Sequence, residues 1–117
     1  MSLLTYKVLH ILGISLALVA LGGAAQRALD GDSGGSRKLA GITHGVGLLI
    51  ILVSGFGLLA KLGIGFPPWV WLKLVIWLVI AALLVLIRKM PQHATLFWFA
   101  LPVLTGIAAY LALYKPF

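Results

Sequence analysis

Four side chains that can carry a positive charge lie within or near the long apolar runs of this sequence. They are Lys7, His10, His44 and Lys73. Lys73 stands in the stretch PWVWLKLVIWLVIAALLVLI, where a charge is costly unless a partner or water reaches it. An imidazole nitrogen can ligate a metal or exchange a proton, and an ammonium can bind an anion or an acceptor oxygen. These residues are therefore the candidates for chemistry.

Carboxylates, which would support other kinds of chemistry, are almost missing from the sequence. Asp30 and Asp32 are the only acidic residues, and both lie between the first two apolar runs. Catalysis by paired carboxylates, proton-coupled transport through a carboxylate and an oxygen-ligand metal cage within the runs are thereby excluded. The chain also has no cysteine, which excludes disulfides, thiolate metal sites and thiol catalysis.

Four apolar runs are the elements that must position these residues. Of the 117 residues, 62% are hydrophobic and 9% are charged, which is too apolar for a water-soluble core of this size. The runs cover residues 3–25, 39–60, 69–87 and 94–114. About 20 helical residues cross a hydrocarbon layer about 30 Å thick, and the runs lack the alternation of strands. We expect one all-α transmembrane domain, an up-down-up-down four-helix bundle in a lipid bilayer.

The basic residues sit mostly at the ends of the runs and set the expected orientation. A formal net charge of +7 would favour nucleic acid in a soluble protein, but here it indicates topology signals and headgroup contacts, so we expect no nucleic-acid partner. Arg27, Arg37, Lys38, Arg88 and Lys89 would lie on one side, and Lys7, Lys61 and Lys115 on the other. Since lysine and arginine favour the cytoplasmic side, we expect a multi-pass protein of a bacterial inner membrane with both termini outside.

Small residues indicate where the helices approach one another. Those of the second run are Gly41, Gly45, Gly47, Ser54, Gly55 and Gly57. Such a density lets neighbouring backbones come close, and Gly41 and Gly45 have the spacing of a helix contact motif. We expect these residues to make contacts within the chain, with a homodimer or membrane partner through Gly41 and Gly45 as the alternative.

Depth within the runs sorts the candidate residues. Lys73 and His10 lie about 8 and 10 Å below the same surface, at 1.5 Å per residue from the start of each run. His44 lies in a run of opposite direction, so its depth differs from that of His10 by about 10 to 15 Å. One iron cannot bond both imidazoles over that distance, because each bond to nitrogen is about 2 Å long. A tetrapyrrole would take His10 or His44 as its single axial ligand, or be held by two subunits.

Each candidate residue also has a purely structural interpretation. Lys73 can extend its ammonium to the headgroups by snorkelling along the helix. His10 and His44 can each donate to a carbonyl of a neighbouring helix, and His93 fits a solvated loop position. In the functional alternative, Lys73, His10 and Lys7 form a cationic pocket whose partner is a propionate, a phosphate or a quinone oxygen.

Several stretches of the sequence resemble a group of small helical membrane proteins. YKVLHILG contains His10, and WLKLVIWL contains Trp71 and Lys73. They resemble the SirB-like family, the copper-resistance D-type proteins and the membrane-bound protoporphyrinogen oxidases. THGVGLLIILVSGFGLL with the terminal YLALYKPF looks like four-helix relatives of the same size. In the oxidase branch a first-span histidine and a third-span lysine serve tetrapyrrole binding, a role that the resemblance gives to His10 and Lys73.

Three functions agree with these observations. The first is binding of haem, another tetrapyrrole or a quinone near the outer leaflet by residues that comprise His10, Lys73, Lys7, Trp71 and His44, with His10 as the metal ligand if the group is a haem. The second is a non-enzymatic membrane subunit or assembly factor, and the third is an anion-conducting dimer that uses Lys73. The chain has ILGISLALVALGG where the oxidase branch has an arginine and aromatic-rich signature, which leaves open whether it is an enzyme.

Overall fold

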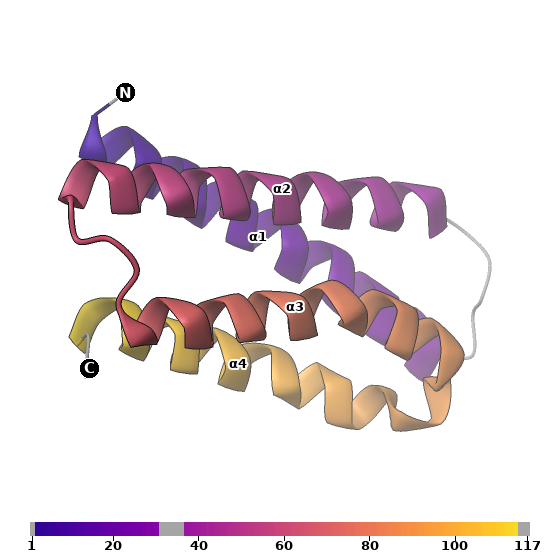
Figure 1. The fold of residues 1–117 in the computed structure, drawn as a ribbon. Helices are drawn as coiled ribbons and strands as arrows, with labels where there is room; N and C mark the ends of the chain where they lie inside the picture. Colours follow the sequence, from indigo (N-terminus) through magenta and orange to yellow (C-terminus); the bar gives the residue numbers. More distant parts are fainter. Residues whose placement is uncertain (1, 31–36, 115–117) are drawn as a thin grey trace.

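The structure, a computed structural model, describes residues 2–30 and 37–114, which form four long helices and one short one (Figure 1). The long helices are α1 (Leu3–Leu29), α2 (Arg37–Leu62), α3 (Pro68–Lys89) and α4 (Ala94–Tyr114), and the 3-10 helix η1 (Pro91–His93) precedes α4. Within the described ranges there is no strand. Each of the four long helices is long and apolar enough to cross a membrane. The all-α class is therefore confirmed, and the arrangement is compatible with a four-helix bundle.

Hydrogen bonds at both ends of α1 explain where this helix begins and ends. The Ser2 hydroxyl accepts a hydrogen bond from the backbone N–H of Thr5 at 3.2 Å, which caps the first turn. At the other end, α1 continues to Leu29, beyond residue 25, where the first apolar run ends. The Gln26 side chain donates to the Asp30 carboxylate at 3.3 Å, and the backbone N–H of Asp30 still bonds the Gln26 carbonyl. The predicted loop between the first two helices is thus shorter, and its residues 31–36 lie outside the described part of the chain.

The link between α2 and α3 depends on two glycines. Gly63 and Gly65 have φ angles of 65° and 66°, in the left-handed region that side chains with a Cβ rarely adopt. The backbone N–H of Gly63 bonds the Leu59 carbonyl at 3.0 Å and closes the end of α2. α3 then begins at Pro68, whose fixed φ suits a first helical residue. The link thereby places the start of α3 near the end of α2 (Figure 1).

The closest helix pair is α1 with α2. A Cβ added at Gly47 would lie 2.8 Å from the backbone nitrogen of Ala17 and 2.8 Å from the backbone oxygen of Gly13. A Cβ at Gly13 would lie 2.9 Å from the backbone oxygen of Gly47. Only glycine fits both positions, because the two backbones leave no room for a side chain. The ring of Tyr6 covers Gly57 in a similar way.

Gly45 takes no part in this crossing. A Cβ added at Gly45 would meet no described heavy atom within 4 Å, and one at Gly41 would lie 3.9 Å from the Arg88 guanidinium. Residue 45 is about 200° around the helix from residue 47, because each residue turns the helix by about 100°. The prediction that Gly45 makes a contact within the chain is therefore wrong. Gly47, and not Gly45, is the glycine at which the α2 backbone approaches that of α1.

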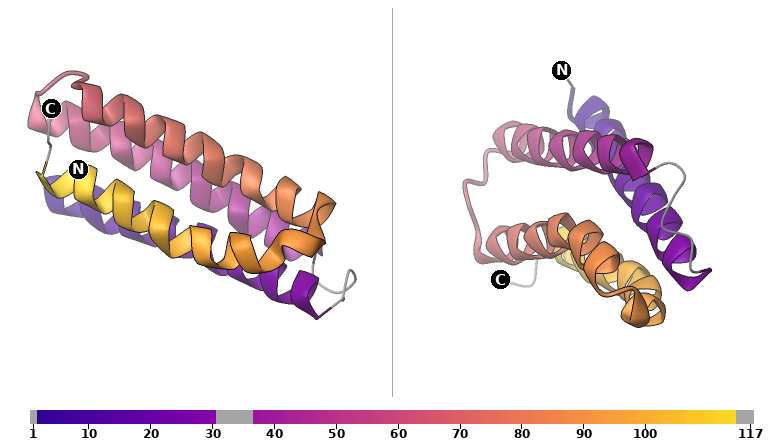
Figure 2. Two further views of the ribbon diagram at one scale, coloured as in Figure 1. Left: turned by 90° about the horizontal axis from the view of Figure 1, so that it is seen from below. Right: turned by 90° about the vertical axis from the view of Figure 1, so that its right-hand side faces the viewer.

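The main hydrophobic core joins α1, α3 and α4. Its buried members are Leu21, Ala24, Ala25, Leu83, Leu84, Ile87, Phe97 and Leu101. A smaller cluster of Trp69, Val70 and Leu111 lies where α3 begins and α4 ends. Among the described residues, α2 contributes no buried member to either cluster. Figure 2 shows that α2 instead crosses α1. α1 therefore contacts each of the other three long helices.

Candidate functional site

His10 is held on α1 by a hydrogen bond to α2. Its Nδ1 lies 2.9 Å from the Oγ of Ser54, and Ser54 is 2% exposed. A Cβ added at Gly55 would lie 3.4 Å from Cε1 of the His10 ring, so that glycine leaves room for the imidazole. The His10 side chain itself is half-buried. The ring is therefore fixed against α2 on one edge and is not sealed inside the helix array.

Lys73 reaches the same end of the molecule from α3. Its half-buried side chain belongs to the sixth residue of α3, at nearly the depth of His10, which is the eighth residue of α1. The Nζ atom also lies 6.0 Å from the ring centroid of Trp69, one turn earlier, which is the outer limit of a cation–π contact. Both His10 and Lys73 belong to the half of the structure where α1 and α3 begin (Figure 1).

A carboxylate that could neutralise Lys73 is missing from this end of the described structure. Asp30 is the only carboxylate side chain in residues 2–30 and 37–114, and it caps the far end of α1. Twenty residues separate it from His10 along the helix, which corresponds to about 30 Å. Asp32, the other acidic residue, lies outside the described residues.

His44 has a different environment and a structural partner. It is 5% exposed, and its Nε2 lies 3.1 Å from the Ile80 carbonyl oxygen of α3. A carbonyl only accepts, so the imidazole donates this hydrogen bond. The indole of Trp77 donates in the opposite direction, from α3 to the Leu48 carbonyl of α2, at 3.1 Å. The two side chains therefore cross-link α2 and α3 reciprocally.

The two histidines do not form one metal site. His10 contacts Ser54 on α2, whereas His44 is ten residues earlier on that helix. Ten residues correspond to about 15 Å, which agrees with the separation expected from depth. Within the described part of the chain, no group of three or more His, Cys, Asp or Glu residues could hold a metal ion. Any metal at His10 would take that imidazole without His44.

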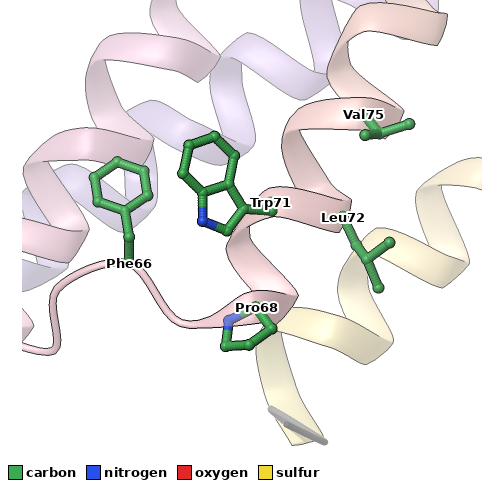
Figure 3. A pocket seen from close by; sticks show the side chains of 5 residues that line it. All are labelled: Phe66, Pro68, Trp71, Leu72 and Val75. Atoms are coloured by element: carbon green, nitrogen blue, oxygen red, sulfur yellow. The ribbon is translucent and has the colours of Figure 1, made fainter.

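Trp71 is not gathered with His10 and Lys73, and Lys7 is exposed. Trp71 is about 200° around α3 from Lys73, and 59% of its surface is exposed. It lines a shallow apolar hollow of about 490 Å³ together with Phe66, Pro68, Leu72 and Val75 (Figure 3). The Phe66 and Trp71 ring centroids are 5.5 Å apart. Lys7 is exposed on α1, one turn before His10.

Ser54 is the residue of this site that the sequence did not assign. Its small side chain predicts a packing position, whereas it is the hydrogen-bond partner of His10. No local pattern joins residues that lie 44 positions apart, so only the helix crossing could reveal the pair. Trp69 could have been found, because aromatic and basic side chains four residues apart on a helix are neighbours.

We use the name polar cluster for His10, Ser54 and Lys73, which lie at the same end of the helix array on α1, α2 and α3. Its members combine an imidazole, a hydroxyl and an ammonium, which can donate, accept and bind negative charge. Comparisons of the chain with protein-family models, with curated proteins and with solved structures find no match in any of the three.

Proposed function

We propose that the protein is integral to a bacterial inner membrane, with α1 to α4 crossing it in up-down-up-down order and both termini outside. The length and hydropathy of the four helices support this proposal. Large apolar side chains are also exposed on their outer faces, among them Val19 at 71% and Leu113 at 80%. A surface of this kind is stable in lipid and would drive aggregation in water. The excess of basic residues in the first and third loops supports the orientation.

We propose further that the polar cluster binds a tetrapyrrole such as haem, or a quinone, near the outer leaflet. One observation carries this proposal: Lys73 and the hydrogen-bonded pair of His10 and Ser54 lie at the same end of the structure, while Asp30, the carboxylate side chain of the described residues, lies about 30 Å from His10 along α1. The Trp69 ring attracts the cation without neutralising it. A propionate or a quinone oxygen would supply the missing acceptor.

The donor set of the polar cluster fits a ligand held by a single histidine. His10 offers one half-buried imidazole, and His44 is about 15 Å away with Nε2 committed to Ile80. Lys73 would hold the anionic or carbonyl end of the ligand. A bound haem would supply electron transfer or ligand chemistry at its iron, whereas the residues of the chain bind it, orient it and exclude water.

A titration of the purified protein tests the proposed function. Haemin added to the protein in detergent should bind saturably and shift its main absorption band, and His10→Ala should abolish the shift. His93→Ala is the matched control, because His93 is exposed in η1 and far from the polar cluster in sequence. A short-chain quinone, followed by quenching of tryptophan fluorescence, tests the other ligand. Absence of saturable binding for both probes would contradict the proposal.

A membrane subunit that contacts its partner through α2 is the second candidate function. The open environment of Gly45 and the exposed outer face of α2 favour it, because a second helix could approach there closely. Since the chain has no cysteine, Gly45→Cys would report such contact by cross-linking. Leu96→Cys on the exposed face of α4 is the control. Equal cross-linking of both variants in membranes would exclude a specific homodimer at Gly45.

A further inference from the structure

The hydroxyl of Ser54 has only one proton, and the structure shows where that proton goes. The Oγ atom lies 2.6 Å from the Ile50 carbonyl oxygen and 3.2 Å from that of Ile51, both one turn earlier on α2. Carbonyl oxygens only accept, and two oxygens at 2.6 Å repel each other unless a proton lies between them. Ser54 therefore donates to its own helix, as serine often does at this spacing.

Because the Ser54 hydroxyl proton is used in the bond to its own helix, the direction of the hydrogen bond to His10 is fixed. The Oγ atom can only accept from Nδ1 of His10 at 2.9 Å, so Nδ1 carries a proton. A second proton on Nε2 would place a positive charge on a half-buried ring, and Asp30, the carboxylate side chain of the described residues, lies at the far end of α1. The neutral imidazole with its proton on Nδ1 and its lone pair on Nε2 is the state that this arrangement favours.

We infer that Ser54 is a positioning residue that holds His10 with its proton on Nδ1. The lone pair of Nε2 is then free, so the polar cluster binds a ligand with a group that accepts this electron pair. An iron ion or an acidic hydroxyl is such an acceptor. The ligand part of this inference rests on the proposed function, whereas the position of the proton does not.

The two basic groups of the polar cluster then have different roles in binding. The Nε2 atom of His10 gives an electron pair, and the ammonium of Lys73 gives hydrogen bonds. A ferric porphyrin matches both through its iron and its propionates, and a quinol matches His10 through a hydroxyl. An oxidised quinone offers only acceptor oxygens, which Lys73 can bind and His10 cannot. Quinol should therefore bind more tightly than quinone if the quinone type is the ligand.

The surroundings of Ser54 are suited to hold a ring in one orientation. Ser54 is 2% exposed and sits in the middle of α2, and the neighbouring Gly55 lies under the His10 ring. Positions on helices hold a geometry better than positions on loops. A partner on the far nitrogen is also what usually orients a metal-binding histidine and sets which ring nitrogen is free.

Nitrogen NMR of the ligand-free protein decides the position of the proton. In protein labelled with ¹⁵N-histidine, the shifts and couplings of His10 should show a proton on Nδ1 and none on Nε2. His44 serves as an internal control of opposite type, because its Nε2 donates to Ile80. Ser54→Ala should move the His10 proton to Nε2 at least in part, while Ser54→Thr, which keeps the hydroxyl, should not. A proton on Nε2 of His10 in the parent protein, or no change in Ser54→Ala, would overturn the inference.

Binding measurements with the same variants separate the inference from the proposed function. Haemin affinity should fall about tenfold or more in Ser54→Ala, as is usual when the partner of a ligating histidine is removed, and Ser54→Thr should restore it. Equal haemin affinity in the parent protein and Ser54→Ala would refute the positioning role. If the parent binds neither haemin nor a short-chain quinone nor its quinol, the proposed function and the ligand part of the inference fail, and the NMR result still decides the role of Ser54.

Discussion

At the scale of single residues, Lys73 has two interpretations with different consequences. Its ammonium lies 6.0 Å from the centroid of Trp69, one turn toward the start of α3, which is the direction in which a snorkelling lysine extends. His10 of α1 lies at a similar depth in the same half of the structure, and the proposed function gives Lys73 a ligand contact there that a purely snorkelling lysine does not require. Substitution separates these two roles, because a charge that only needs water tolerates changes that a ligand contact does not.

Both Lys73→Met and Lys73→Arg should weaken haemin binding by about tenfold or more. A hydrogen bond to a charged group contributes about 1.5 to 3 kcal/mol, and the guanidinium differs from an ammonium in shape and hydration. Thermal stability in detergent should change little in either variant. Lys61→Met is the control, because Lys61 is exposed at the end of α2. If Lys73→Arg binds haemin like the parent protein and Lys73→Met remains equally stable, Lys73 merely snorkels.

At the scale of the elements, the α1–α2 pair owes its closeness to two glycines that face each other. The Gly13 and Gly47 backbones are near enough that a Cβ on either would overlap the other helix. Gly45 belongs to the same helix as Gly47 and has open space where a Cβ would go. The two positions therefore form a matched pair for testing the crossing.

Gly47→Ala should lower the free energy of unfolding by about 1 to 3 kcal/mol, the usual cost of forcing an extra group into a tightly packed contact. Gly45→Ala should be neutral or stabilising by up to about 1 kcal/mol, since alanine is the better helix former. Thermal unfolding in detergent, followed by circular dichroism, measures both. Equal stability of the two variants would show that α1 and α2 do not cross at Gly47.

The α2–α3 pair is held differently, by side chains that bond to backbone. His44 and Trp77 each donate across the interface at 3.1 Å, and α2 adds no buried side chain to the described hydrophobic clusters. We therefore expect these two hydrogen bonds to contribute to the stability of this interface. Hydrogen bonds between transmembrane helices contribute about 0.6 kcal/mol on average and up to about 1.7 kcal/mol.

Trp77→Phe should consequently lower the free energy of unfolding by about 0.6 to 1.7 kcal/mol, because it removes the N–H donor and keeps an aromatic ring. Denaturant unfolding in micelles measures the change. Trp98→Phe is the control, since Trp98 is 42% exposed on α4. A loss of stability no larger in Trp77→Phe than in Trp98→Phe would mean that the bond to Leu48 contributes nothing.

At the scale of the whole molecule, both described chain ends lie at the same end of the helix array (Figure 1). The basic residues of the first and third loops lie at the opposite end, where Lys38 and Arg88 are exposed. Arg37 and Lys115, which also entered the expected charge balance, belong to positions whose side chains are outside the described structure. This arrangement allows both termini to face one side of a membrane.

Reporter fusions test that orientation. A reporter active only outside the cytoplasm should be active when joined after Tyr114, because the basic loops favour the cytoplasmic side. The same reporter inserted at His93, between α3 and α4, should be inactive, whereas a cytoplasmic reporter should be active there. The opposite pattern at both positions would reverse the proposed topology.

The features that depend on order along the chain could be predicted without the structure. Four apolar runs and the rise of a helix set the number of helices, and the bounds of α4 coincide with the fourth run. The same arithmetic put His10 and Lys73 at one depth and His44 at another. The lack of carboxylates in the runs follows from composition alone. None of these properties depends on how a helix is rotated about its axis.

Rotation about the helix axes was decided only by the tertiary structure. The helices are apolar on nearly all sides, so hydropathy does not indicate which face meets a neighbour. Packing of α1 on α2 turned Gly47 inward and Gly45 outward, and it brought Ser54 to His10 across 44 positions. The rotation of α3 likewise left Trp71 exposed and Lys73 half-buried. Contacts between helices depend on these rotations, because a turn of about 100° per residue moves each neighbouring side chain to another face.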